Sequence, residues 1–127
     1  MHFPVNTYIE VKTVQGLLAS AFEGGSNYWA AICERNEPIQ MRHQFDDSRV
    51  FAHTDYPVNF GGSLRVRDTE DENQKEYVLD DSAIKRGLDT MADKYPMHFG
   101  AILAEDDDAE TADVFLQCCL FDKVVYG

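Results

Sequence analysis

The sequence predicts an α+β fold, with an N-terminal helix and a C-terminal cluster of three helices packed on a small antiparallel sheet of about three strands. Apolar residues recur every three or four positions near the N-terminus and again in the last third, as in helices with one buried face. Between them lie short apolar and aromatic runs separated by turn-forming residues. The chain of 127 residues is 44% hydrophobic, enough for one core, so we expect a single compact domain over residues 1–127.

The first helix is expected from about Tyr8 to Glu23, where the apolar residues follow one helical stripe. Gly24 is then the natural left-handed residue that ends it. Residues 28–34 are aromatic and apolar, which favours a strand covered on both faces and leaves a helix as the alternative. Next comes an irregular segment, residues 35–62, with Pro38 among its breakers.

Two further strands are expected at residues 63–67 and 76–79, joined by the polar loop 68–74 as an antiparallel pair. Asp80 or Asp81 is suited to cap the helix that follows. Pro96 fits the first turn of a second helix, residues 97–105.

The last helix is expected over residues 110–121, and it is apolar almost all round. A helix of this kind has to be covered on several sides. We therefore predict that it is the central helix of the fold.

Charge is the strongest functional signal: 23 Asp and Glu against 11 Lys and Arg give a formal net charge of −12. Such a surface repels nucleic acid and anionic membranes and attracts basic partners, so we expect neither direct nucleic-acid binding nor membrane binding. The acids are dense between Asp68 and Asp113, in two segments. The predicted partner-binding residues in them are Asp68, Glu70, Asp71, Glu72, Glu105, Asp106 and Asp107.

Blocks near both ends of the chain resemble one protein family. They are Glu23–Trp29 (EGGSNYW), Gly87–Ala92 (GLDTMA) and Asp113–Gln117 (DVFLQ), the last followed by Leu120-Phe121 and by the ending Val124–Gly127 (VVYG). The family consists of small, functionally unassigned proteins of tailed bacteriophages, in which a glycine usually stands where this chain has Asp122. The resemblance implies a phage origin and action in the cytoplasm of a bacterial host. It implies no catalytic residue.

Charge and resemblance together favour a protein that binds and inhibits a host nucleic-acid-handling or defence protein, in the manner of anti-CRISPR or anti-restriction proteins. Carboxylates would imitate a phosphate backbone and occupy a basic groove of that host protein. Mimicry of this kind requires both acidic segments to lie on one face. The competing interpretation is that the acid serves only solubility.

Two alternatives remain open. The first is a pocket that binds or sequesters a nucleotide-like small molecule, formed by Ser26, Asn27, Tyr28, Trp29, Arg42 and Arg49. Its glycines follow a helix rather than precede one, which disfavours phosphate binding. The second is a phage accessory protein that self-associates, for example as a homodimer, by pairing its basic middle with its acidic regions.

No motif indicates an enzyme, a metal site or a cofactor. The sequence lacks nucleophile elbows, phosphate loops and paired zinc-binding histidines, and the acidic run 105–110 lacks the ligand spacing of a calcium loop. Its 3 cysteines are an odd number, and two of them lie in an apolar run, which favours a reduced, intracellular protein. No signal peptide or membrane span is expected from the hydropathy pattern.

Overall fold

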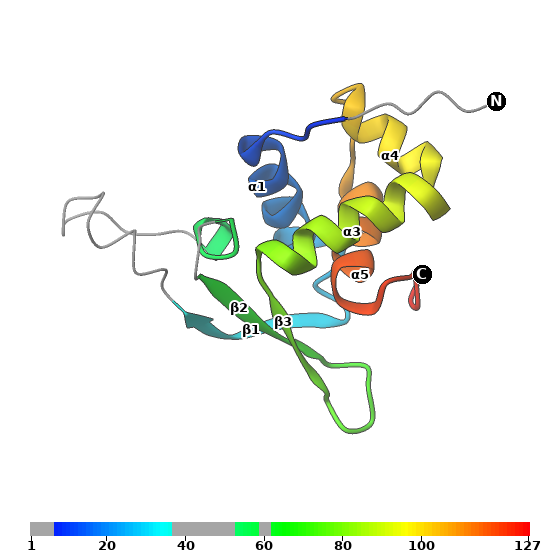
Figure 1. Cartoon of the computed structure of the whole chain (residues 1–127). Helices are drawn as coiled ribbons and strands as arrows, with labels where there is room; N and C mark the ends of the chain where they lie inside the picture. Colours follow the sequence, from blue (N-terminus) through cyan, green and yellow to red (C-terminus); the bar gives the residue numbers. More distant parts are fainter. Residues whose placement is uncertain (1–6, 37–52, 59–61) are drawn as a thin grey trace, which may run out of the picture.

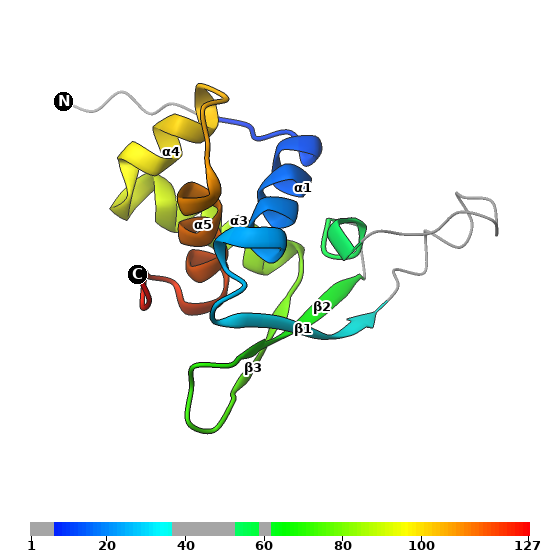
Figure 2. The ribbon, with the colours of Figure 1, turned by 180° about the vertical axis from the view of Figure 1, so that it is seen from behind.

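The computed structural model describes residues 7–36, 53–58 and 62–127. It confirms the α+β class, with helices from both ends of the chain packed on one three-stranded antiparallel sheet (Figure 1). The view from behind in Figure 2 shows the same layers, with the helices gathered on one side of the sheet. The predicted arrangement of helix, sheet and helical cluster is therefore correct.

The N-terminal helix α1 (Val11–Ser20) begins later than expected, because residues 7–10 are not helical. Its Val14, Leu17 and Leu18 are buried. The helix passes directly into a π-helical turn, η1 (Ala21–Gly25).

At the end of this helix the structure requires glycine at position 25, for packing, and not at position 24 for a left-handed cap as predicted. Neither Gly24 nor Gly25 has a left-handed backbone, so the expected left-handed cap is wrong. A Cβ atom at Gly25 would lie 2.3 Å from the carbonyl oxygen of Ala109. Glycine is needed here because the turn η1 packs directly against the backbone at the start of the last helix.

The sheet has the order β1-β2-β3, with both neighbouring pairs antiparallel. Its strands are β1 (Ala30–Asn36), β2 (Ser63–Asp68) and β3 (Glu76–Leu79), the last two close to the predicted bounds. The prediction that the first strand is covered on both faces is wrong, since it is exposed beyond Ile32 and its pairing with β2 is irregular between Ile32 and Glu34.

The two faces of the sheet differ sharply. Leu64, Val66 and Leu79 point into the core and are fully buried. On the other face Arg65 forms ion pairs with Glu34 at 3.3 Å and with Glu76 at 3.7 Å. This outer face is therefore a solvated surface on which the charges are already paired.

The C-terminal cluster consists of α3 (Asp81–Lys94), α4 (Pro96–Leu103) and α5 (Ala109–Phe121). Asp80 is the residue that caps α3, accepting a hydrogen bond of 2.9 Å from the Ala83 amide. Pro96 opens α4, as predicted. Each helix thus begins at a residue that the local sequence specifies.

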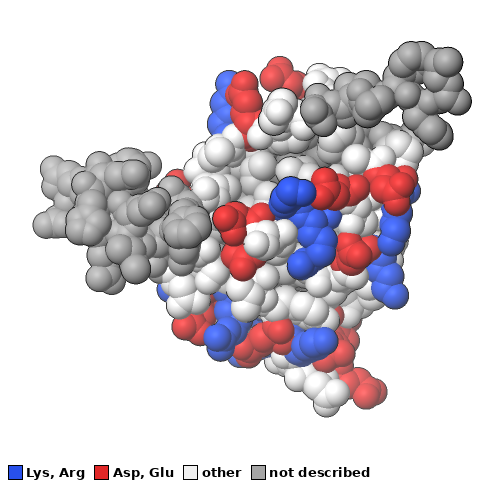
Figure 3. Space-filling model, viewed as in Figure 1, with Lys and Arg blue, Asp and Glu red and all other residues white. Residues whose placement is uncertain are grey.

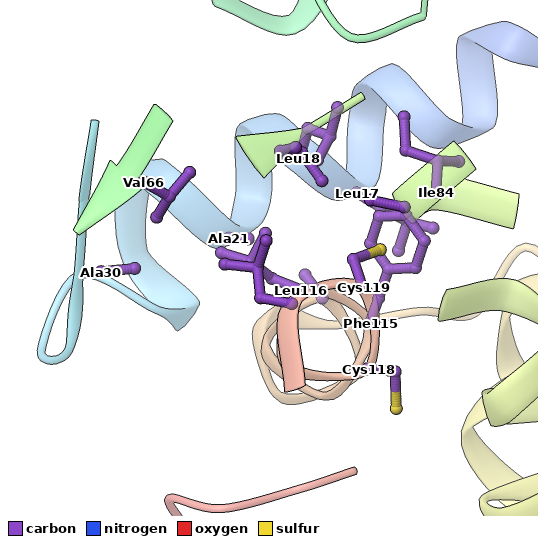
Figure 4. Close-up of a cluster of buried hydrophobic side chains, with 14 of the residues drawn as sticks. Leu17, Leu18, Ala21, Ala30, Val66, Ile84, Phe115, Leu116, Cys118 and Cys119 are labelled. Carbon is purple, nitrogen blue, oxygen red and sulfur yellow. The ribbon is translucent and has the colours of Figure 1, made fainter. Parts of the chain in front are cut away.

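Helix α5 is the central helix, as its composition predicted. Residues 111–120 are all buried, and the helix contacts α1, α3, α4 and β3. In Figure 4, Phe115 and Cys119 lie toward Leu17 of α1, whereas Cys118 points away from that cluster. Helices α3 and α5 approach closely at Gly87 of α3, where an added Cβ atom would lie 2.9 Å from the Cys119 amide nitrogen.

Little of the predicted irregular segment is described. Its described part includes a short 3-10 helix, η2 (His53–Asp55), tied to α1 by a 3.0 Å hydrogen bond from Gln15 to Asp55. Tyr56, next to it, is buried in the core. None of the helices in the described part of the chain is long and apolar enough to cross a membrane.

Candidate functional site

The two acidic segments lie at opposite ends of the molecule. Residues 69–75 form the loop of the β2–β3 hairpin, which extends below the sheet in Figure 1. Residues 104–108 connect α4 to α5 at the far end of the helical layer, and both views agree on this separation (Figures 1 and 2). The two segments therefore do not form one continuous acidic patch.

Asp68 is not a surface residue, so its prediction as an exposed partner-binding acid is wrong. Its exposed fraction is 4%. One carboxylate oxygen accepts a hydrogen bond from the Tyr126 hydroxyl at 2.7 Å, and the other accepts one from the Glu70 amide at 3.0 Å. Side chains alternate between the two faces of the sheet along β2, so Asp68 lies on the same face as Leu64 and Val66. That face packs against the core, which is why Asp68 is buried.

The remaining hairpin acids, Glu70, Asp71 and Glu72, form what we term the hairpin tip. Asp71 accepts hydrogen bonds from the amides of Asn73 and Lys75, both at 3.1 Å, and so shapes the loop. Glu70 and Glu72 are exposed. The hairpin tip thus presents two exposed acids and one that is engaged in its own turn.

The other end carries the acidic turn, which we define as Glu105, Asp106 and Asp107. All three are exposed, and within the described residues none has an ion-pair partner. Glu105 has a left-handed backbone (φ 56°), and the Asp106 amide closes the turn by donating to the Ala101 carbonyl at 2.8 Å. Three exposed carboxylates, unpaired within the part of the chain that the structure describes, are therefore presented on a well-defined turn.

Asp108, directly after the acidic turn, has a structural task. It caps α5 by accepting a 2.9 Å hydrogen bond from the Thr111 amide, and that bond lowers the pKa of its carboxyl group. The cap holds the start of α5, so the acidic turn is attached to the central helix.

Between the two ends the charges are mixed. Figure 3 shows Lys and Arg side chains interleaved with Asp and Glu on the face that includes α3. Lys85, for example, lies 3.1 Å from Asp89 one turn later in that helix. No continuous acidic band joins the two ends on this face.

The block proposed as a small-molecule pocket is an internal anchor instead. The Ser26 hydroxyl, the Tyr28 hydroxyl and the Trp29 indole nitrogen each donate to Asp113 at 2.7 Å. Ser26 and Trp29 are fully buried, so they present no polar atoms to a ligand. Burial, together with the bond to Asp113, raises the pKa of Tyr28 to about 12.

The other residues of that predicted pocket do not complete it. Asn27 is exposed, and Arg42 and Arg49 lie outside the described residues. Arg65 and Arg67, the strand arginines, are in ion pairs with glutamates on the outer face of the sheet. The described part of the chain therefore does not support this alternative.

Asp113 is the residue that sequence reasoning missed. It is a buried carboxylate, 8% exposed, that holds three donors from the segment after η1. The available signal in the sequence is that Asp113 is the one charged residue among residues 111–120, in the helix predicted to be apolar almost all round. A charge in such a run requires hydrogen-bond donors from elsewhere in the fold.

No metal centre emerges from the described residues, since they include no group of three or more His, Cys, Asp and Glu side chains placed to hold an ion. Among the histidines, Nδ1 of His98 lies 2.9 Å from the Thr111 hydroxyl.

Fold and site together define a small α+β protein with two separated acidic ends. No family model, curated protein or solved structure matches the chain. The resemblance to tailed-phage proteins stays a prediction, although the left-handed backbone of Asp122 (φ 64°) is the conformation that a glycine at that position would favour.

Proposed function

We propose that the protein is a non-enzymatic binding protein that attaches to a basic surface of a host nucleic-acid-handling or defence protein through the acidic turn, and thereby inhibits it. One observation carries the proposal: Glu105, Asp106 and Asp107 are exposed, adjacent and without ion-pair partners among the described residues. Free carboxylates on a defined turn attract a basic surface without first breaking internal contacts.

The acidic turn is favoured over the hairpin tip because fewer of its carboxylates have internal tasks. In the hairpin, Asp68 is buried and Asp71 accepts two amides of its own loop. The net charge of −12 adds long-range attraction that raises the rate of encounter with a basic partner. Contact by one end replaces the broad phosphate mimicry that a shared face would have provided.

The test is a pair of charge-neutralised variants at the two ends. One is Glu105→Gln/Asp106→Asn/Asp107→Asn, and the matched control is Glu70→Gln/Glu72→Gln, which spares the loop-forming Asp71. Bacterial strains that carry a defined restriction system or CRISPR effector express each variant, and phage plating efficiency reports inhibition. The acidic-turn variant is expected to lose protection of the phage, whereas the hairpin variant retains it.

A second measurement separates binding from expression. The host protein is captured on immobilised wild type and on both variants at low and high salt, because contacts between exposed charges weaken with salt. Equal capture and equal protection by wild type and the acidic-turn variant would contradict the proposal.

A further inference from the structure

A band of apolar surface adjoins the acidic turn. Tyr8, Val11 and Leu103 have exposed fractions of 89%, 56% and 51%, which places them among the few large hydrophobic side chains of the described residues that face solvent. They come from the extended segment before α1, from α1 itself and from the end of α4. Single exposed hydrophobic residues need no explanation, but a contiguous group marks a contact surface.

The band is hollowed. One hollow of about 500 Å³ is lined by Tyr8, Ile9, Leu88 and Phe99, and a second of about 230 Å³ shares Ile9 and Leu88 with it. A third, of about 150 Å³, includes Tyr8, Ile9 and Leu103. Because Ile9 lines all three, the hollows adjoin one another, and we term them together the Ile9 groove. The first two are lined mainly by apolar side chains, whereas the third, which also includes Glu10, Thr13 and Glu105, is the more polar end.

The rim of the Ile9 groove is acidic. The acidic residues that line it are Glu10, Asp81, Asp89 and Glu105, against Lys85 as the basic one. Lys85 is paired with Asp89, and Glu10 is paired with Lys12 at 3.3 Å. Asp81 and Glu105 are therefore the rim acids without an ion-pair partner among the described residues. Glu105 belongs both to this rim and to the acidic turn, so the groove and the turn form one surface.

An apolar groove with an acidic rim has a complementary ligand. A segment whose apolar side chains recur at helical spacing fills the groove, while Lys and Arg at its flanks meet the rim. We propose that the Ile9 groove and the acidic turn together bind a basic amphipathic segment of the partner protein. This inference rests on the proposed function, and it names the chemistry of the partner surface.

The probe is a fluorescent peptide with leucines on one helical face and lysines on the other, compared with a scrambled peptide of the same composition. Binding is followed by fluorescence anisotropy at physiological salt, where non-specific attraction to the net charge is screened. The full chain is expected to bind the amphipathic peptide at least about tenfold more tightly than the scrambled one, because only the ordered peptide buries a continuous apolar face.

The matched variants change exposed apolar residues on and off the groove. Tyr8→Ser/Leu103→Ser is expected to weaken binding of the amphipathic peptide about tenfold or more, since both side chains lose apolar contact. Val78→Ser/Val125→Ser is the control, because Val78 and Val125 are similarly exposed, at 52% and 49%, and line none of the three hollows. This control variant should bind as wild type does.

Several outcomes would overturn the groove proposal. The first is equal binding of the amphipathic and scrambled peptides, and the second is unchanged peptide binding by Tyr8→Ser/Leu103→Ser. The third is tight peptide binding by a chain that lacks residues 2–6 when the full chain does not bind the peptide. The fourth is a homodimer of the wild type that Tyr8→Ser/Leu103→Ser converts to monomers. The last two would assign the groove to this chain itself. The two proposals can fail separately in the phage plating assay. If the acidic-turn variant no longer protects the phage from the host defence system but Tyr8→Ser/Leu103→Ser still does, the proposed function stands and only the groove proposal fails.

Discussion

At the scale of single residues, the informative positions are buried acids that bring distant segments together. Asp113 gathers Ser26, Tyr28 and Trp29 around one carboxylate. Asp68 holds the end of the chain by accepting a hydrogen bond from the Tyr126 hydroxyl. A carboxylate in a buried position is stable only when donors surround it, so each of these acids determines how its neighbours are placed.

Removal of the Asp113 carboxylate is expected to destabilise the fold strongly. Asp113→Ala leaves the buried donors of Ser26 and Trp29 without an acceptor, which costs about 3 kcal/mol of the free energy of unfolding. Urea denaturation measures that loss. Asp107→Asn, an exposed change, is the control and should stay within about 0.5 kcal/mol of wild type. Equal stability of the two variants would refute the anchoring role of Asp113.

The hydrogen bond between Tyr126 and Asp68 predicts a pH dependence at the alkaline end. Donation to the carboxylate favours the neutral phenol and raises the pKa of Tyr126 from 10.0 to about 12. Because the folded pKa is raised, the stabilisation is complete below pH 10.0 and is lost as the pH rises through about 12.

Tyrosinate absorbance in the near ultraviolet checks this pKa. In Asp68→Asn the titration of Tyr126 is expected to move back toward the ordinary value, and Tyr126→Phe identifies which step belongs to this residue. An unchanged titration in Asp68→Asn would show that the carboxylate is not the cause.

At the scale of elements, the close contact between α3 and α5 determines how the helical cluster packs. Gly87 faces Cys119, whose backbone lies where a side chain on α3 would have to go. Arg86 strengthens the same contact by donating to the Cys119 carbonyl at 2.8 Å. The two helices approach this closely only because residue 87 has no side chain.

Two glycine substitutions test this contact. Gly87→Ala places a Cβ atom 2.9 Å from backbone atoms of Cys119, so the helices must separate, at a cost of about 2 kcal/mol. Gly100→Ala in α4 is the matched control, because nothing lies within 4 Å of its added Cβ atom. It should be neutral or raise stability by up to about 1 kcal/mol. Thermal or urea unfolding measures the stability of both variants. If Gly87→Ala is as stable as Gly100→Ala, the close packing of α3 against α5 at residue 87 is contradicted.

At the scale of the whole molecule, the C-terminal tail connects the central helix to the sheet. Gln117, fully buried in α5, accepts from the amides of Val125 and Tyr126 at 2.7 and 2.8 Å and donates to the Tyr126 carbonyl. Tyr126 in turn reaches Asp68 at the end of β2. Trp29 and Phe121 pack beside it, with ring centroids 5.8 and 6.0 Å from that of Tyr126.

Loss of the Gln117 amide is expected to detach this tail. Gln117→Leu keeps an apolar side chain in the core but leaves the Tyr126 backbone without its partners, at a cost of about 2 kcal/mol. Amide hydrogen exchange at Val125 and Tyr126 should accelerate, and the pKa of Tyr126 should fall as it leaves Asp68. Lys123→Ala, an exposed change in the same tail, is the control. Unchanged exchange in Gln117→Leu would refute the connection.

Local patterns in the sequence account for the fold class and for most of the helices and strands. The cap at Asp80, the start at Pro96 and the buried character of α5 were all predictable, because capping and periodicity act over a few neighbouring residues. The π turn at Gly24 was not, since it depends on the contact of Gly25 with a residue far along the chain. Of the candidate site, the exposure of the acidic turn was predictable and the burial of Asp68 was not.

The sequence by itself determined the net charge of −12, the α+β class and the two segments in which the acids gather. Only the tertiary structure decided that these segments lie at opposite ends, that Asp68 and Asp113 are internal, and that an apolar groove adjoins the acidic turn. The reason is physical: charge and periodicity are properties of neighbours in the chain, whereas the bond between Ser26 and Asp113 joins residues 87 positions apart.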